Sequence, residues 1–151
     1  MDHNDVVKTL NKLIETSKDG EYGFRTSGEH CKSPQIRELF MKRAEECRKA
    51  AAELQSLVVQ HGGSAEDSGS ASGAMHRGWV AVKGALAGYT DLAMLEETER
   101  GEDVALASYR RALEQDLPPN VRSVVETQLQ GVQRNHDQVR MLRDQARAAD
   151  A

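Results

Sequence analysis

Apolar residues recur at intervals of three and four along four separate stretches of this chain. That spacing matches one face of an α-helix, so each stretch predicts an amphipathic helix that buries one stripe. The clearest stripe, in the second stretch, consists of Ile36, Phe40, Ala44, Cys47, Ala51, Leu54 and Val58. Four such helices bury their stripes best against one another, which predicts an all-α four-helix bundle.

The ends of the four predicted helices carry typical boundary signals. Asn4 and Asp5 are good N-cap residues, Ser33 precedes a proline, and Pro118 and Pro119 separate the last two helices. We expect a single domain over residues 1–151. Its helices are predicted at about 4–31, 34–61, 91–115 and 119–147.

The connection between the second and third helices, residues 62–90, is far longer than the loops that usually join neighbouring antiparallel helices. It contains an amphipathic segment near residues 75–86 with the single tryptophan, Trp79. A connection of this length can cross the whole bundle, so the third helix is expected to begin where the first one finishes. Trp79 is expected to pack this segment onto the bundle. The alternative is that Arg77 and Trp79 form a recognition patch.

Composition argues against several classes of protein. Charges of both signs are mixed along the chain, with a net charge of −4, so no basic face predicts a nucleic-acid partner. No apolar run approaches the roughly 18 residues of a membrane span, so no membrane association is expected. The N-terminus lacks the apolar region of a secretion signal, and Cys31 and Cys47 show no paired framework. We therefore expect a cytoplasmic protein with free thiols.

Ionisable residues occupy four positions in register with the apolar stripes: Glu21, Glu99, Glu102 and His136. Such groups are rarely buried unless they are paired or bind metal. If the long connection crosses the bundle, Glu21, Glu99 and His136 fall at the same depth as the Glu45-Glu46 pair of the second helix. The agreement is within roughly one turn, at about 1.5 Å of rise per residue. The pattern predicts an inward cluster of carboxylates and one imidazole.

Several short motifs bring the chain close to a known family. They are Asp19-Gly20-Glu21-Tyr22-Gly23-Phe24, Glu45-Glu46, His76-Arg77-Gly78-Trp79, the segment from Leu95 to Asp103, Tyr109, and His136-Asp137. In order and spacing they resemble the bacterial ferritin-like four-helix-bundle proteins that carry domain of unknown function 2383, over almost the whole chain. The resemblance implies a ferritin-like bundle with one long crossover. It implies no known activity, and a role in stress or iron handling is only one hypothesis that it raises.

Ferritin-like di-iron proteins use a Glu from each of two helices and a Glu-x-x-His motif from each of the other two. Carried over to this chain, the single Glu positions are Glu21 and Glu99. Glu46 is followed three residues later by Lys49, and His136 is preceded three residues earlier by Gln133, so both Glu-x-x-His motifs are incomplete. We therefore expect no di-iron oxidase and no catalytic residue.

Two hypotheses for the inward cluster remain. In the first, it binds a metal ion, with iron or manganese as candidates for oxygen and imidazole ligands. The candidate ligands are Glu21, Glu46, Glu99, Glu102 and His136. In the second, the cluster is a buried salt-bridged network, with Lys49 or an arginine beside the carboxylates. The bundle is then non-catalytic and associates with itself or a protein partner. The neighbouring Glu97 and Asp103 are expected on a solvated face.

Overall fold

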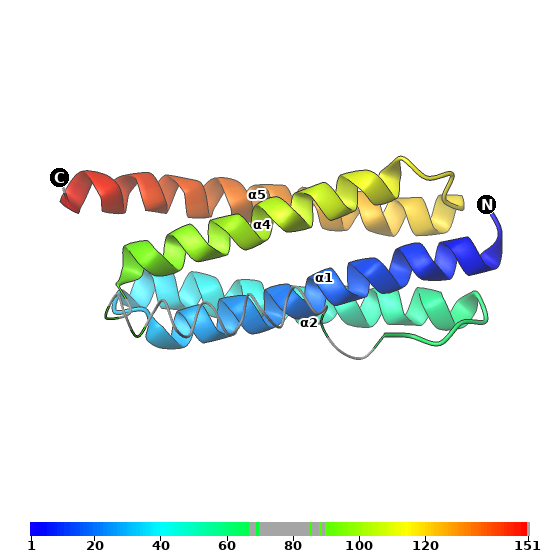
Figure 1. Ribbon diagram of the computed structural model, residues 1–151, viewed down its shortest axis with the longest axis horizontal. Coiled ribbons are helices and arrows are strands. Elements are labelled where there is room, and N and C mark those ends of the chain that lie inside the picture. The colour runs from blue at the N-terminus through cyan, green and yellow to red at the C-terminus, as the bar shows by residue number, and fades with distance from the viewer. Residues whose placement is uncertain (67–68, 70–84, 86–87, 89, 151) are drawn as a thin grey trace.

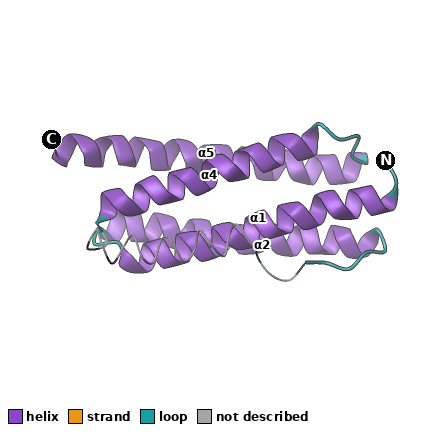
Figure 2. Cartoon of the chain, in the orientation of Figure 1, coloured by secondary structure: helices purple, strands orange, loops and turns teal. Residues whose placement is uncertain are grey.

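The computed structural model describes residues 1–66, 69, 85, 88 and 90–150. They contain the predicted bundle (Figure 1): α1 (His3–His30), α2 (Pro34–Gln60), α4 (Asp91–Leu113) and α5 (Pro119–Asp150). Figure 2 shows the described residues as helices joined by loops, without a strand. The largest difference from the predicted bounds is in α5, which continues to Asp150. The predicted segment near residues 75–86, with its His76-Arg77-Gly78-Trp79 motif, lies outside the described residues, apart from Ala85.

The helix starts are stabilised by side-chain caps. Ser33 and Thr90 cap α2 and α4, each hydroxyl accepting the backbone N–H of the residue three positions later. The cap of α1 is Asp2 rather than the predicted Asn4 or Asp5, and its carboxylate accepts the N–H of Asp5 at 2.8 Å. These bonds satisfy N–H groups that have no partner within their helix.

Asp91, the first residue of α4, shows how the helices are connected in space. Its carboxylate accepts the backbone N–H groups of Lys32 at 2.7 Å and Ser33 at 3.0 Å, in the turn between α1 and α2. The third helix therefore begins at the end of the bundle where α1 finishes, as predicted. Figure 1 shows two antiparallel pairs, α1 with α2 and α4 with α5. α4 also packs along α1, whereas α2 and α5 make few direct contacts.

The apolar core is divided into two clusters along the bundle. One cluster contains Leu10, Ile14, Leu54, Leu106, Tyr109 and Val125. The other contains Phe24, Phe40, Ala44, Met94, Leu95 and Val139. The whole predicted stripe of α2 is buried. On α1, Val6 is buried and its neighbour Val7 is only partly buried. Between Ile14 and Phe24 the inward residues of α1 are small or polar, and the candidate site lies at this level.

Candidate functional site

A buried ion pair lies between the two apolar clusters. Arg43 on α2 donates from Nε to Oε1 of Glu102 on α4 at 3.1 Å, and the two side chains are 9% and 2% exposed. Asn135 on α5 donates from Nδ2 to the same oxygen at 2.6 Å. Arg43 also donates from Nη1 to the half-exposed Glu46 at 3.3 Å. Side chains from three helices thus meet at one carboxylate whose charge is balanced inside the protein.

Burial and pairing act in opposite directions on the pair. Burial raises the pKa of Glu102, the Arg43 charge and the Asn135 hydrogen bond lower it, and the net shift is upward. For Arg43, burial lowers the pKa, but Cys47 and the carboxylates of Glu102 and Glu46 outweigh it, so the pKa lies above its ordinary value. The guanidinium is therefore a permanent positive charge at the centre of the bundle.

The predicted ligands Glu21 and Glu99 each pair with an arginine. Glu21 accepts from Arg25, one turn later on α1, at 3.1 Å. Glu99 accepts from Nη1 of Arg143 on α5, and both of these side chains are mostly buried. Each carboxylate therefore already has a cation from the protein beside it.

His136 contacts Asp103 rather than the buried carboxylate. Its Nε2 lies 2.7 Å from Oδ1 of Asp103, which is exposed as predicted, and a proton on Nε2 donates to that oxygen. The inward position belongs to the preceding residue, Asn135. Both residues fit the helical spacing. Asn135 lies three residues after Val132 and four before Val139, whereas His136 lies four residues after Val132 and three before Val139.

Each of the five predicted ligands thus contacts another side chain of the protein. Within the described part of the chain, no three Asp, Glu, His or Cys side chains gather closely enough to hold a metal ion. A cation beside Glu102 would also face the fixed charge of Arg43. Lys49, the other candidate for a protein cation, is exposed. A metal site on these residues stays a prediction, and the geometry observed is that of the salt-bridged alternative.

Arg43 was not singled out from the sequence as a core residue. It lies three residues after Phe40 and four before Cys47, so it is in register with the buried face of α2. Ala44 fits the same face and is apolar, which made it the preferred interpretation. Helical spacing therefore places the positive charge of Arg43 on the buried face of α2, and this spacing could have identified Arg43 as a partner for Glu102.

The expectation that Glu97 is solvated is wrong. Its side chain is fully buried, and an oxygen of its carboxylate lies 3.1 Å from Nη1 of Arg100. The physical reason is that the first half of α4 is buried on more than one face, since Ala93, Met94 and Thr98 are buried as well. A single stripe therefore does not describe this part of the helix.

A second polar contact lies farther along the bundle from the ion pair. The hydroxyl of Tyr109 donates to Oε1 of Gln128 at 2.7 Å and lies 3.3 Å from Oγ of Ser17. Because that hydroxyl already donates to Gln128, Ser17 is the donor in the second bond. Burial raises the pKa of Tyr109 to about 12, so the hydroxyl keeps its proton at neutral pH.

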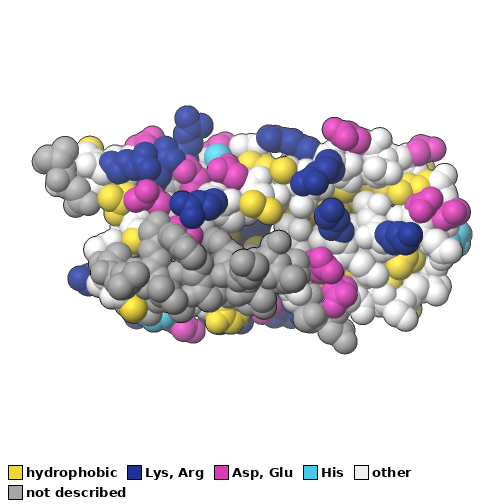
Figure 3. Space-filling view, viewed as in Figure 1, with side chains coloured by type: hydrophobic (Ala, Val, Ile, Leu, Met, Phe, Trp, Pro, Cys, Tyr) yellow, Lys and Arg dark blue, Asp and Glu magenta, His cyan; other side chains and the backbone are white. Residues whose placement is uncertain are grey.

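A cavity of about 630 Å³ runs beside both polar contacts. Ser17, Gly23, Phe24, Cys47, Glu102 and Tyr109 are among the residues that line it. In the space-filling view a hollow is visible near the middle of the molecule, between α4 and α1 (Figure 3). The cavity thus lies at the level where the apolar core is interrupted.

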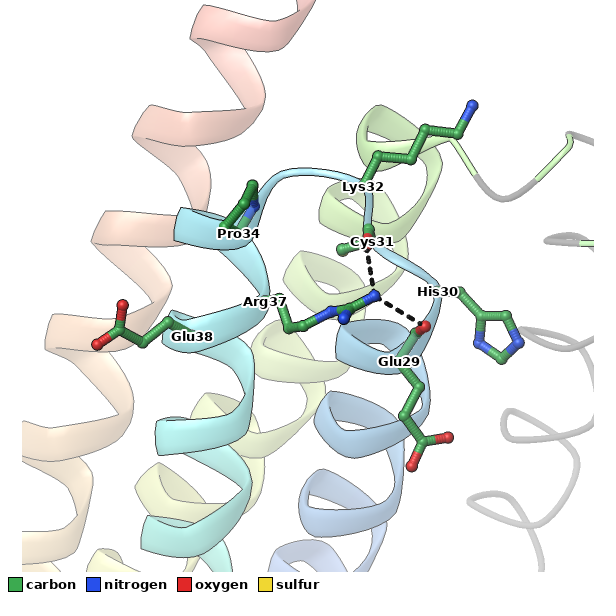
Figure 4. A pocket seen from close by; sticks show the side chains of 7 residues that line it. All are labelled: Glu29, His30, Cys31, Lys32, Pro34, Arg37 and Glu38. Carbon is green, nitrogen blue, oxygen red and sulfur yellow. Dashed lines mark hydrogen bonds between the residues drawn. The ribbon is translucent and has the colours of Figure 1, made fainter.

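Another concave surface lies at the turn between α1 and α2 (Figure 4). The guanidinium of Arg37 lies in this surface and donates to the backbone carbonyls of Gly28 at 3.2 Å and Cys31 at 3.1 Å. It also makes a longer bond to the backbone carbonyl of Glu29 at 3.4 Å. Carbonyls at the end of a helix lack partners within the helix, so Arg37 serves as a cap for α1. The capping of α1 therefore accounts for the position of Arg37 in this surface.

The comparisons with known proteins agree with the fold. A family model described as Domain of unknown function (DUF2383) matches residues 5–115. The chain belongs to this family. No protein with a curated description matches it.

Among solved structures, the chain is similar to a mutant of Dps1 from Mycobacterium smegmatis, with a TM-score of 0.76 and 15% identity over 93% of this chain and 96% of that one. It is also similar to the bacterioferritin-related protein from Bacteroides fragilis, described as a dodecameric thioferritin. Here the TM-score is 0.78, with 14% identity over 99% of this chain and 91% of that one. At these identities the likeness establishes the ferritin-like fold alone. None of the described helices is long and apolar enough to span a membrane.

Proposed function

We propose that this member of the family is a non-catalytic ferritin-like bundle with a structural or protein-interaction role. In it, Arg43 supplies the positive charge at the centre of the bundle. The observation that carries the proposal is the contact of Arg43 and Asn135 with the single buried carboxylate of Glu102. All three groups are at least nine-tenths buried.

The electrostatic argument rests on what a divalent cation would have to replace. Binding at Glu102 would require Arg43 to leave the carboxylate or to remain beside the metal. The first leaves a buried cation without its partner, and the second brings two like charges together in a medium of low dielectric constant. Both oppose binding, so the arginine favours an interior without a bound metal.

We also infer that the chain associates with copies of itself. This inference is supported by the shared fold with the Bacteroides fragilis protein, whose description is dodecameric. A subunit of an assembly needs a bundle with a unique register, and a buried polar contact across three helices disfavours shifted packing.

The competing candidate is a metal-binding ferritin-like protein that uses Glu21, Glu46, Glu99, Glu102 and His136. It is favoured by the fold, which is that of a protein described as a thioferritin. The two candidates differ in what the central carboxylate binds, so a metal analysis separates them.

The experiment measures metal content in protein purified without chelator, loaded with ferrous iron or with manganese, and desalted. We expect far less than one metal ion per chain in the wild type and in Glu102→Gln. The control is Glu126→Gln, because Glu126 is half-exposed and outside the predicted ligand set. About one metal ion per chain, lost in Glu102→Gln and kept in Glu126→Gln, would contradict the proposal.

The same preparations test self-association by light scattering after size exclusion. We expect a mass that is a multiple of the 16.7 kDa chain. A monomer at every accessible concentration would contradict the inferred assembly and leave the account of the ion pair untouched.

A further inference from the structure

The central cavity has the size and the wall of a small-molecule site. Its volume of about 630 Å³ lies within the range of typical ligand pockets, roughly 300–1,000 Å³. Phe24, Cys47 and Val132 supply apolar surface, and Ser17, Arg43 and Tyr109 supply a few polar groups. We propose that this cavity binds an uncharged, largely apolar small molecule that carries a carbonyl or hydroxyl group. The inference does not rest on the proposed structural role.

Small residues keep the cavity open. Gly20 and Gly23 on α1, Ala50 on α2, Gly101 and Ala105 on α4, and Gly131 on α5 all line it. Glycine within a helix lowers helix stability relative to alanine, so this composition needs a reason. Close packing is the reason for a glycine at position 20, because an added Cβ on Gly20 would lie 2.9 Å from Sγ of Cys47. At Gly23, which is buried, an added Cβ would meet no atom of the described residues within 4 Å. Close packing against the described residues therefore does not explain Gly23.

The charges of the wall favour an uncharged ligand. The described lining contains five Lys or Arg residues and five Asp or Glu residues. The most buried charges among them, Arg43 and Glu102, already neutralise each other. A charged ligand would lose its water of hydration on entry, and the buried charges among the described lining residues would offer it no unpaired counter-charge.

Two polar atoms remain available to orient a ligand. Arg43 donates from Nε to Glu102 and from Nη1 to Glu46, and within the described part of the chain its Nη2 makes no hydrogen bond. Because Ser17 donates its proton to Tyr109, Oγ of Ser17 retains lone pairs that can accept. A carbonyl oxygen fits the first group and a hydroxyl fits both. One donor and one acceptor in a mainly apolar wall match the usual design of small-molecule pockets.

The test uses the full chain and two fluorescent probes of similar size, the neutral ketone 6-propionyl-2-(dimethylamino)naphthalene and the anionic 1-anilinonaphthalene-8-sulfonate. We expect the neutral probe to bind once per chain and more tightly than the anionic one. Ala105→Leu places a larger side chain at the cavity wall and should weaken binding of the neutral probe at least tenfold. Ala107→Leu is the matched control, because it makes the same change on the exposed face of α4, and it should leave binding unchanged.

Melting curves of the variants show whether lost binding reflects a filled cavity or an unfolded protein. Ala105→Leu should melt no lower than the wild type. If it melts lower, Gly23→Leu decides, since its new Cβ would lie more than 4 Å from the other described residues. The proposal is overturned if the neutral probe does not bind, if the anionic probe binds more tightly, or if the folded cavity variant binds as the wild type does.

Discussion

Removing either partner of the buried ion pair alone should destabilise the fold more than removing both together. The two substitutions are Arg43→Met, which keeps most of the arginine stem, and Glu102→Leu, which keeps most of the side-chain volume. Arg43→Met leaves the buried Glu102 without a counter-charge, and Glu102→Leu leaves the buried Arg43 with only the half-exposed Glu46 as an ion-pair partner. Together they leave an apolar contact and an Asn135 amide that has lost one acceptor.

The expected magnitudes follow from burial, since the two side chains are 9% and 2% exposed. Breaking a buried pair by removing one partner costs about 3–5 kcal/mol. Replacing both partners by apolar residues is often close to neutral, and the unsatisfied Asn135 amide adds about 1–3 kcal/mol. With singles near 3 and a double near 2 kcal/mol, the coupling free energy is about 4 kcal/mol.

The assay is urea unfolding followed by far-ultraviolet circular dichroism, for the wild type, both single variants and the double variant. The control cycle uses Arg48→Met and Glu45→Leu, since this ion pair also lies on α2 and its side chains are 48% and 46% exposed. Exposed pairs often contribute nothing measurable. A coupling for Arg43 and Glu102 no larger than that of the control pair would refute the assignment of a buried, dehydrated pair.

Three further predictions follow from the same contacts. Because the folded-state pKa of Glu102 is raised above its ordinary value of 4.5, folding favours its protonated form. The stability of the wild type relative to Glu102→Gln should therefore fall as the pH rises from 4.5 toward neutral, and a urea series in which the difference grows instead would contradict the upward shift. Burial raises the pKa of Cys31 and of Cys47 to about 12, so a thiol-reactive disulfide should label neither in the native protein at neutral pH and both in urea. Rapid native labelling would show that one thiol is accessible. Tyr109→Phe removes the donor to Gln128 and the acceptor for Ser17 and should cost about 1–3 kcal/mol in urea unfolding. An unchanged midpoint would mean that water replaces the hydroxyl without loss.

The fold could be predicted because each stripe repeats one spacing over many residues. On α2, every residue of the predicted stripe is buried, and Pro34 begins the helix as expected. The long connection predicted that α4 starts beside the end of α1, and the contacts of Asp91 with Lys32 and Ser33 confirm it. These features depend on the helical period and on the connection length, and both can be read directly from the sequence.

The candidate site was harder to predict because neighbouring residues fit the same face. Asn135 and His136 both continue the stripe of α5, and only side-chain packing decides that the amide reaches Glu102. On α2, Arg43 and Ala44 likewise both fit the spacing of the buried face, so the sequence pattern did not single out Arg43. Helical register predicted an inward Glu102, which is buried, but register does not determine which group lies beside a carboxylate.

The most direct measurement of the central claim is anomalous diffraction at the iron and manganese edges from crystals soaked in those metals. The account predicts the guanidinium of Arg43 against the carboxylate of Glu102, with no anomalous peak within coordinating distance of Glu102 or Glu46. A peak bonded to Glu102, with Arg43 turned away, would contradict it.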